Sequence, residues 1–281
     1  MNKRLALTKE GKLTYCTASE ENIGKGRCNH IAHQKNNETA EEFTKRINQK
    51  PKELKRKMTK EDNIILAKRM IVDNVYRSAR LEGIGTTYAE TEDILNNKGC
   101  ANLRADEVTT IINLKRAWEF SLDEKNLNRD IDFSLMQDLH EILGRGLETL
   151  RWNEIGKFRT DGVHIGGTNW RPSLPNPEKM WNELIELKKE ENIVERAMNI
   201  HLWCCKTQAF KDCNKRVAGF LANHELIKNA TGIFSVPDTK YNKYKELLVR
   251  YYETNEDKEI KEFIYNYCYI YDSEGLPFIV E

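Results

Sequence analysis

The sequence QAFKDCNKR, residues 208–216, decides the fold because two apolar helical patterns meet there. Apolar residues recur every three or four positions on both sides of it. We therefore expect two packed helices, at 193–207 and 214–229, joined by a short polar loop. Free backbone N–H groups at the start of the second helix, together with Lys215 and Arg216, make this loop a candidate anion site. The simpler alternative is that Asp212 or Asn214 only caps the helix and the two cations are exposed.

The helical pattern continues over much of the chain outside this loop. It covers the ranges 132–143, 177–190, 241–252 and 257–271, and apolar residues keep the same spacing from Glu61 onward. The exception is GKFRTDGVHIGGTNWRPSLP, residues 156–175, where alternation, a Gly-Gly pair and two prolines predict a short β-hairpin. The predicted fold class is mainly α: a helical bundle with a short β-hairpin, preceded by a small N-terminal α+β module.

The first part of the chain differs from the rest in charge. Residues 1–60 hold 15 lysines and arginines against 7 acidic residues, although the whole chain has a net charge of only +1. Turn signals and β-compatible stretches such as Leu13-Thr14-Tyr15 precede a helix candidate from Thr39 to about Asn48. We predict a small basic module at 1–50, a linker at 51–62 and the main domain at 63–281. Such a basic run is more often a solvated face than a nucleic-acid site.

Four side chains of the basic module could hold a metal ion. Cys16, Cys28, His30 and His33 offer four ligands for a tetrahedral Zn²⁺ site. Their spacing lacks the short C-x₂₋₄-C knuckle of common zinc fingers. The favoured alternative is a small β-element that packs on the helical domain or recognises a partner.

Composition points to a soluble protein in a reducing compartment. No apolar run is long enough to span a bilayer, and no apolar segment follows the basic N-terminus to mark it for secretion. The seven cysteines are an odd number scattered along the chain, which does not suggest a disulfide framework. We expect a cytoplasmic protein without membrane contacts.

The 208–216 loop resembles the motif of a known family. QAFKDCNKR is similar to the Fic motif HPFxDGNGRxxR and closer to its Doc-like form HxFxDANKR, and the flanking helices match as well. Residues 156–167 are similar to the family's flap, a β-hairpin that pairs with a target segment by strand addition. SARLEG, residues 78–83, resembles the inhibitory-helix motif [ST]xxxE[GN]. The resemblance covers roughly residues 60–275.

This resemblance implies a Fic/Doc-like helical domain that binds ATP with Mg²⁺. It implies transfer of AMP, or another phosphate-containing group, to a Ser, Thr or Tyr hydroxyl of a protein, as a toxin or a regulator. The position of the catalytic histidine is Gln208, with Asp212 as Mg²⁺ ligand and Arg216 as a further catalytic residue. The resemblance assigns nucleotide binding to Phe210, Lys211, Asp212, Cys213, Asn214, Lys215 and Arg216. It assigns regulation to Ser78, Glu82 and Gly83, and target docking to Val163, His164, Ile165 and Gly166.

The sequence departs from the family pattern at two positions. Gln208 replaces the histidine that acts as general base, and a neutral amide does not accept a proton at physiological pH. Gly219 stands where GNGRxxR has its second arginine, which Doc-like members also lack. Three alternatives stay open: a slow or inactive adenylyltransferase, a catalytically dead scaffold that binds nucleotide or protein, and a Doc-like protein kinase toxin. Under each alternative the protein could also bind an antitoxin or a second copy of itself. We do not expect nucleic acid as a partner.

Overall fold

The computed structural model describes residues 4–8, 13–16, 30–33, 39, 42 and 58–271. The chain forms two compact units, one of residues 1–57 with 272–281 and one of residues 58–271. Within the described part of the chain, no helix is both long and apolar enough to cross a bilayer.

The smaller unit contains a three-stranded antiparallel sheet. Its strands are β1 (Arg4–Thr8), β2 (Leu13–Cys16) and β3 (His30–His33), in the order β2-β1-β3. The strand predicted around Leu13-Thr14-Tyr15 is confirmed. Thr39 and Glu42 exchange two hydrogen bonds, from Thr39 N–H to Glu42 Oε2 and from Glu42 N–H to Thr39 Oγ1. The rest of the helix predicted from Thr39 to about Asn48 lies outside the described residues. The predicted Zn²⁺ site lies partly outside the described residues, because Cys28 is not among them.

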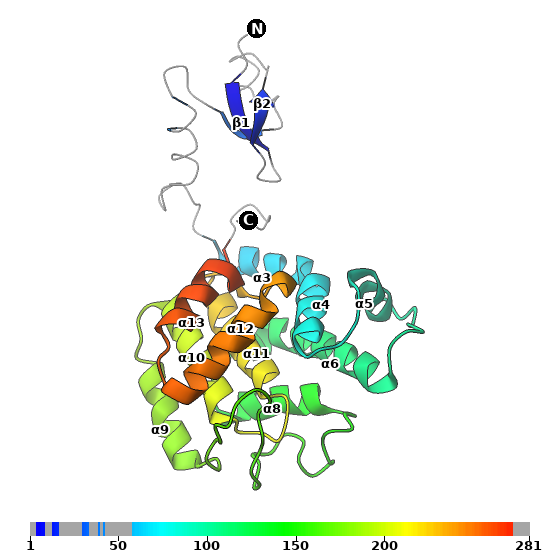
Figure 1. Cartoon of the computed structure of the whole chain (residues 1–281), viewed down its shortest axis with the longest axis vertical. Helices are drawn as coiled ribbons and strands as arrows, with labels where there is room; N and C mark the ends of the chain where they lie inside the picture. Colours follow the sequence, from blue (N-terminus) through cyan, green and yellow to red (C-terminus); the bar gives the residue numbers. More distant parts are fainter. Residues whose placement is uncertain are drawn as a thin grey trace. The chain divides into compact units, whose positions relative to one another are not determined.

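The larger unit is mainly helical, which confirms the predicted fold class (Figure 1). Its helices are α3 (Lys60–Arg69), α4 (Ile71–Leu81), α5 (Tyr88–Leu95), α6 (Ala105–Leu122), α7 (Glu124–Leu127), α8 (Phe133–Gly144), α9 (Pro177–Leu187), α10 (Ile193–Thr207), α11 (Asn214–Lys228), α12 (Tyr241–Thr254) and α13 (Lys258–Phe263). A 3₁₀ turn, η2 (Asp238–Lys240), precedes α12.

The last predicted helix, 257–271, is wrong in its second half. After α13 the chain forms the π-helical turn η3 (Ile264–Cys268) and then the strand β5 (Tyr269–Ile270). β5 pairs antiparallel with β4 (Ile233–Phe234), and Ser235 N–H donates to the Cys268 carbonyl. This pairing with a distant segment overrides the local helical pattern.

Helix α11 runs through the centre of the helical unit. Of its residues, twelve are buried, so it has no solvent-facing stripe. It packs against α10 on one side and against α6, α8 and β4 on others. The hydrophobic core around it includes Phe210, which is fully buried. The loop between α10 and α11 therefore stands on a packed helical hairpin.

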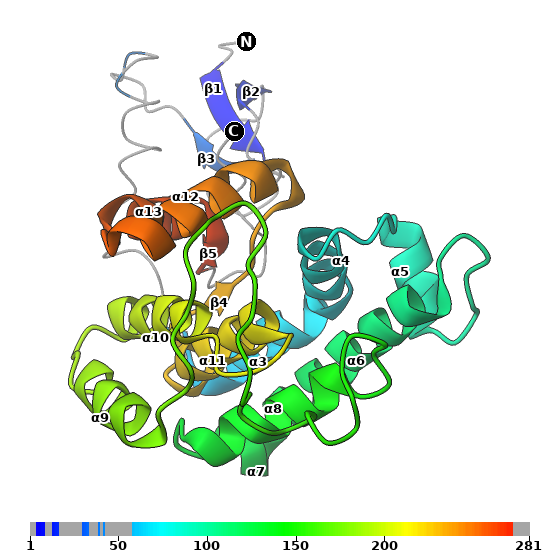
Figure 2. The ribbon, with the colours of Figure 1, turned by 60° about the horizontal axis from the view of Figure 1, so that its bottom comes forward.

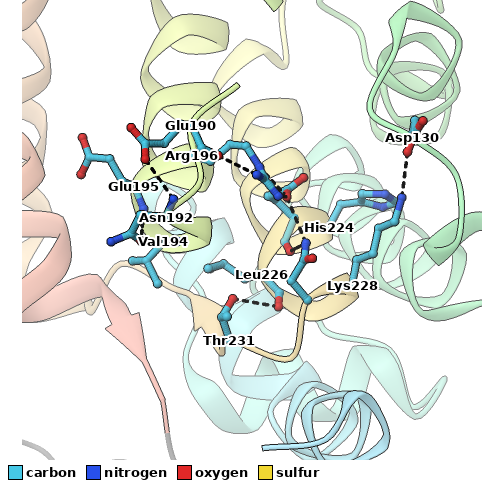
Figure 3. Close-up of polar contacts among 12 residues, drawn as sticks. Asp130, Glu190, Asn192, Val194, Glu195, Arg196, His224, Leu226, Lys228 and Thr231 are labelled. Carbon is cyan, nitrogen blue, oxygen red and sulfur yellow. Dashed lines mark hydrogen bonds and ion pairs between the residues drawn. The ribbon is translucent and has the colours of Figure 1, made fainter. Parts of the chain in front are cut away.

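Charged contacts hold α10 and α11 together at the end away from that loop (Figure 3). The Arg196 guanidinium donates to Glu225 Oε1 at 2.6 and 2.8 Å and to the Glu190 carbonyl at 2.6 Å. Lys228 Nζ lies 3.0 Å from Asp130 Oδ1, next to α8. Both ends of the helical hairpin are thus fixed, one by these contacts and one by the loop.

The segment 156–175 contains no β-strand, although the sequence predicts a hairpin there. Figure 2 shows it as a long loop between α8 and α9 that reaches α12. Thr168 Oγ1 donates to Glu253 Oε1 at 2.5 Å, and the rings of Trp170 and Tyr252 stack at 5.2 Å. Side-chain anchors on α12, rather than a ladder within the segment, therefore hold it in place.

Candidate functional site

The connection between α10 and α11 begins and ends with residues of left-handed backbone conformation. Gln208 ends α10 with φ 48°, and Cys213 precedes α11 with φ 62°. The side chain of Asn214 closes the loop between them. Its Oδ1 accepts from Phe210 N–H at 2.9 Å, and its Nδ2 donates to the Phe210 carbonyl at 2.8 Å. The alternative in which Asp212 or Asn214 caps the helix is wrong, since Cys213 occupies that position.

The start of α11 leaves backbone donors free. Val217 N–H is the first in the helix to find a carbonyl, that of Cys213 at 2.9 Å. In the described part of the chain, the N–H groups of Asn214, Lys215 and Arg216 have no acceptor. Three such groups at the positive end of a fifteen-residue helix can hold an anion.

Asp212 lies beside these donors with both carboxylate oxygens engaged. Oδ1 accepts from Cys213 N–H at 2.6 Å and from Arg216 Nη2 at 3.1 Å, and Oδ2 accepts from Thr149 Oγ1 at 2.6 Å. Burial alone would raise the pKa of Asp212, but Arg216 and the hydrogen bonds outweigh it and hold the pKa below its ordinary value. The carboxylate is ionised and one-third exposed, so it is suited to be a Mg²⁺ ligand. Thr149 would then have to give up its hydrogen bond to Oδ2 or share that oxygen with the metal ion.

Gln208 is tied into the loop by both ends of its amide. Nε2 donates to the Cys205 carbonyl at 2.6 Å, and Oε1 accepts from Asn214 Nδ2 at 3.1 Å. The residue is 8% exposed. A buried neutral amide with both functions bonded positions the loop and takes no proton.

Neither His201 nor His140 is placed to replace the missing base at residue 208. His201 lies in the core with Nε2 2.7 Å from Tyr244 Oη, and burial lowers its pKa to about 4. His140 stacks on Phe210 at 4.0 Å, and its Nδ1 accepts from Gly156 N–H at 2.9 Å. That bond places the ring hydrogen of the neutral form on Nε2, which leaves no free acceptor. His164 is exposed in the 156–175 segment.

Glu82 reaches the same loop from α4. Gly83, with φ 90°, ends that helix in a Schellman motif, in which Ile84 N–H donates to the Ala79 carbonyl at 3.1 Å. The glutamate then lies 3.4 Å from Lys215 Nζ and 3.6 Å from Arg216 Nε. Glu82 therefore engages both cations that an anion at α11 would use.

Gly219 stands at the position of the family's second arginine, and it borders a cavity. At Gly219 an added Cβ would lie 3.8 Å from the Phe234 ring. Without an arginine there, Glu82 pairs with Arg216 of the loop itself.

Cys213 is buried, and burial raises the pKa of its thiol to about 12. It is a small residue fitted to the turn and not a reactive thiolate.

We expect the Glu82 contacts to make stability fall in acid. Burial alone would raise the pKa of Glu82, but Lys215 and Arg216 outweigh it and hold the pKa below its ordinary value of 4.5. The contribution is complete above that value and is lost as pH falls through the lowered pKa, at no more than about 1.4 kcal/mol per pH unit. Urea unfolding of the wild type and of Glu82→Gln between neutral pH and pH 3 measures it. The difference in unfolding free energy should shrink on acidification, and a constant difference would contradict the ion pairs.

The 156–175 segment is fixed to the loop by Arg159, which the sequence did not single out. Its Nε donates to the Gln208 carbonyl at 2.6 Å, its Nη1 to the Asp161 carbonyl at 2.7 Å, and its backbone N–H to the Ala209 carbonyl at 2.9 Å. Val163 and Ile165 are half-buried, whereas His164 and Gly166 are exposed. This alternation leaves His164 and Gly166 on the exposed side of the segment.

The structure thus brings together Glu82 at the end of α4 and the 208–216 loop, whereas no hydrogen bond or ion pair within the described chain joins the predicted residues 163–166 to that loop. Ser78 accepts the Glu82 N–H through its carbonyl, Lys211 is half-buried, and Phe210 anchors the loop in the core. Arg159, Thr149 and His140 were missed. Each acts through a contact between segments distant in sequence, so neither spacing nor periodicity signals it.

Comparison with known proteins agrees with this arrangement. Residues 130–226 match the model of the Fic/DOC family. No curated protein matches the chain. The structure is similar to a Fic domain containing signaling protein from Bacteroides thetaiotaomicron, with a TM-score of 0.56 at 17% identity over 74% of this chain and 85% of that one.

Two further solved structures share the fold at the same low identity. For Fic-1 from C. elegans the TM-score is 0.58 at 17% identity, over 72% of this chain and 61% of that one. For a Fic family protein from Desulfovibrio desulfuricans it is 0.57 at 17% identity, over 72% and 63%. The chain thus spans less than two thirds of the length of these two relatives. Identity at this level shows a common fold.

Proposed function

The chain carries a Fic/DOC-family domain over residues 130–226, and on this premise we propose that it is a Fic-type transferase. It binds a Mg²⁺-nucleotide at the 208–216 loop and transfers AMP, or another phosphate-containing group, to a hydroxyl of a protein. The observation that carries the proposal is the set of free N–H groups at the start of α11, next to Arg216 and an ionised Asp212. Together they form a cradle for phosphate oxygens.

Each residue of the cradle has a distinct task in this proposal. The α11 N–H groups and Arg216 hold phosphate oxygens, and Asp212 would hold Mg²⁺, which neutralises charge on the phosphates. For AMP transfer, the target oxygen bonds to the α-phosphorus, the bond to pyrophosphate breaks, and the hydroxyl proton passes to water. Gln208 takes no part as a base, so we expect transfer to be slower by ~10²–10⁴-fold than with histidine there.

The 156–175 segment is the proposed docking element for the target. Arg159 holds its base against the loop, and the segment has no strand partner of its own in the described chain. Residues 163–166 alternate between half-buried and exposed side chains. An extended target segment could therefore pair with this backbone and present its hydroxyl to the loop.

We expect the wild-type protein to bind ATP in a Mg²⁺-dependent manner. Isothermal titration calorimetry with ATP, with and without Mg²⁺, measures this directly. Asp212→Asn should keep the N–H cradle but lose the metal ligand, so the Mg²⁺-dependent gain in affinity should disappear. Asp161→Asn is the matched control, because that exposed carboxylate has no bonded partner at the loop. Equal Mg²⁺ dependence in all three proteins would refute the assignment of Asp212.

A second candidate is a binding scaffold without transferase activity. The observation that favours it is the Gln208 amide, whose two functions are already used in holding Cys205 and Asn214. Such a residue serves the architecture of the loop.

A Doc-like kinase is the third candidate, favoured by Gly219. Its step would bond the target oxygen to the γ-phosphorus and release ADP, so α- and γ-labelled ATP distinguish the two transfers.

A further inference from the structure

A second cavity lies behind Glu82, between α4, α6, α11 and the segment that follows β4. It adjoins the N–H cradle at the start of α11, because Glu82, Lys215 and Arg216 are among its lining residues. Its walls are largely aromatic and aliphatic, with Trp118 and Phe220 in edge-to-face contact at 5.2 Å. The other aliphatic and aromatic residues that line it are Leu81, Leu114, Phe234, Val236 and Tyr244.

Buried polar atoms without partners gather in this cavity. Both amide atoms of Asn74, the Trp118 Nε1 and the Ser235 Oγ are buried and have no hydrogen-bond partner within the described chain. The three residues are 2%, 2% and 5% exposed, and all line the cavity. Leaving such groups without partners is costly, and native proteins rarely do so.

Other buried asparagines of the same unit show that Asn74 is exceptional. Asn63 uses both ends of its amide on Gly232, accepting from the N–H at 2.7 Å and donating to the carbonyl at 3.0 Å. Asn223 does the same with Phe234, at 2.9 Å for both bonds. Asn74 alone among the buried asparagines of the described residues has neither amide atom bonded. Its donor and acceptor are therefore left without partners in the described chain, beside the cavity that the residue lines.

The charged groups around the cavity are already neutralised. Arg77 Nε lies 2.9 Å from Asp73 Oδ2, and Glu82 pairs with Lys215 and Arg216. A charged ligand would have to break one of these pairs. A neutral ligand would not, and its hydrogen-bonding needs match an amide that offers a donor and an acceptor side by side.

We propose that this cavity is a binding site for a small neutral aromatic ring that bears an amide-like edge, such as an aromatic carboxamide or a nucleobase. The edge pairs with the Asn74 amide, Trp118 Nε1 and Ser235 Oγ supply further bonds, and the ring packs on Trp118, Phe220 and Phe234. Because Asn74 and Glu82 belong to α4 and its end, occupancy would also hold Glu82 against the loop. That last consequence rests on the proposed nucleotide site, whereas the binding itself does not.

Nicotinamide and pyridine form the matched pair of probes, because they share the ring and differ in the carboxamide. In ¹H–¹⁵N spectra of the full chain, millimolar nicotinamide should shift the Trp118 indole and Asn74 amide resonances, and pyridine should shift them far less. Asn74→Leu should weaken nicotinamide binding by roughly tenfold or more, through two lost hydrogen bonds. It should also raise the melting temperature of the ligand-free protein, whereas Asn63→Leu, the partnered control, should lower it.

Two results would overturn the proposal. The first is that neither nicotinamide nor a nucleobase such as uracil shifts the Trp118 and Asn74 resonances of the wild type, which would leave the cavity to ordered water only. The second is that Asn74→Leu binds nicotinamide as tightly as the wild type does. Both readouts are independent of ATP binding and of group transfer, so failure of the proposed function would not imitate either.

Discussion

Replacing Gln208 with histidine is expected to raise the rate of group transfer by ~10²–10⁴-fold, the usual contribution of a general base. Residue 208 has a left-handed backbone and is 8% exposed, with its side chain directed at Asn214 of the loop. Histidine is among the residues that adopt this conformation more readily than most. The N–H groups of α11, Arg216 and Asp212 make no hydrogen bond to the Gln208 side chain, so the substitution adds a proton acceptor beside them while it removes the amide bonds to Cys205 and Asn214.

The measurement is the transfer of label from α- or γ-labelled ATP with Mg²⁺ to proteins of a bacterial lysate. Gln208→Ala is the control, since it removes the amide without adding a base and should show no gain. Label from α-labelled ATP alone indicates AMP transfer, and label from γ-labelled ATP alone indicates phosphorylation. If the histidine variant transfers no more than the wild type, residue 208 is not the position of the base in this protein.

Glu82→Gln is expected to raise the affinity for Mg²⁺-ATP by ~5–150-fold while lowering the free energy of unfolding by about 1–3 kcal/mol. The two effects have opposite signs because the same contacts serve both. Glu82 lies within 3.6 Å of Lys215 and Arg216, so it stabilises the folded chain and competes with phosphate for those cations. Glutamine keeps the shape and removes the charge.

Calorimetric titration and urea unfolding of the same preparation provide the two numbers. Glu92→Gln is the matched control, because Glu92 is exposed on α5 and far in sequence from the loop. It should change neither quantity. An affinity equal to that of the wild type in Glu82→Gln would remove Glu82 from regulation and leave it a structural ion pair.

Much of this arrangement could be predicted from the sequence where the signal is local. The helices at 193–207 and 214–229 follow from regular apolar spacing, and both are found within one residue of those bounds. The motif also predicts that Phe210 is buried and that Asp212 and Arg216 lie at the loop. The end of α4 was not predicted, although Gly83 ends it with a φ of 90°, which favours a residue without a Cβ.

Contacts between distant segments were not predictable in this way. Thr149 and Arg159 bind the loop through a hydroxyl and a guanidinium from irregular chain, for which no spacing rule exists. The 156–175 segment has alternation typical of a strand, yet its anchors on α12 replace the ladder. The second half of the helix predicted at 257–271 was wrong for a related reason. The strand β5 forms because it pairs with β4, and the local sequence pattern does not indicate that pairing.

The Schellman motif at the end of α4 places Glu82 far along the chain from the loop whose cations it contacts. The loop is closed by two helices adjacent in sequence, α10 and α11, which can form their hairpin from local contacts. Glu82 arrives from a helix far upstream, so its contacts depend on long-range docking. A fluctuation that detaches α3 and α4 would expose the cations of a loop that is still folded. We therefore expect the opening of the site and the unfolding of the loop to be different events with different free energies.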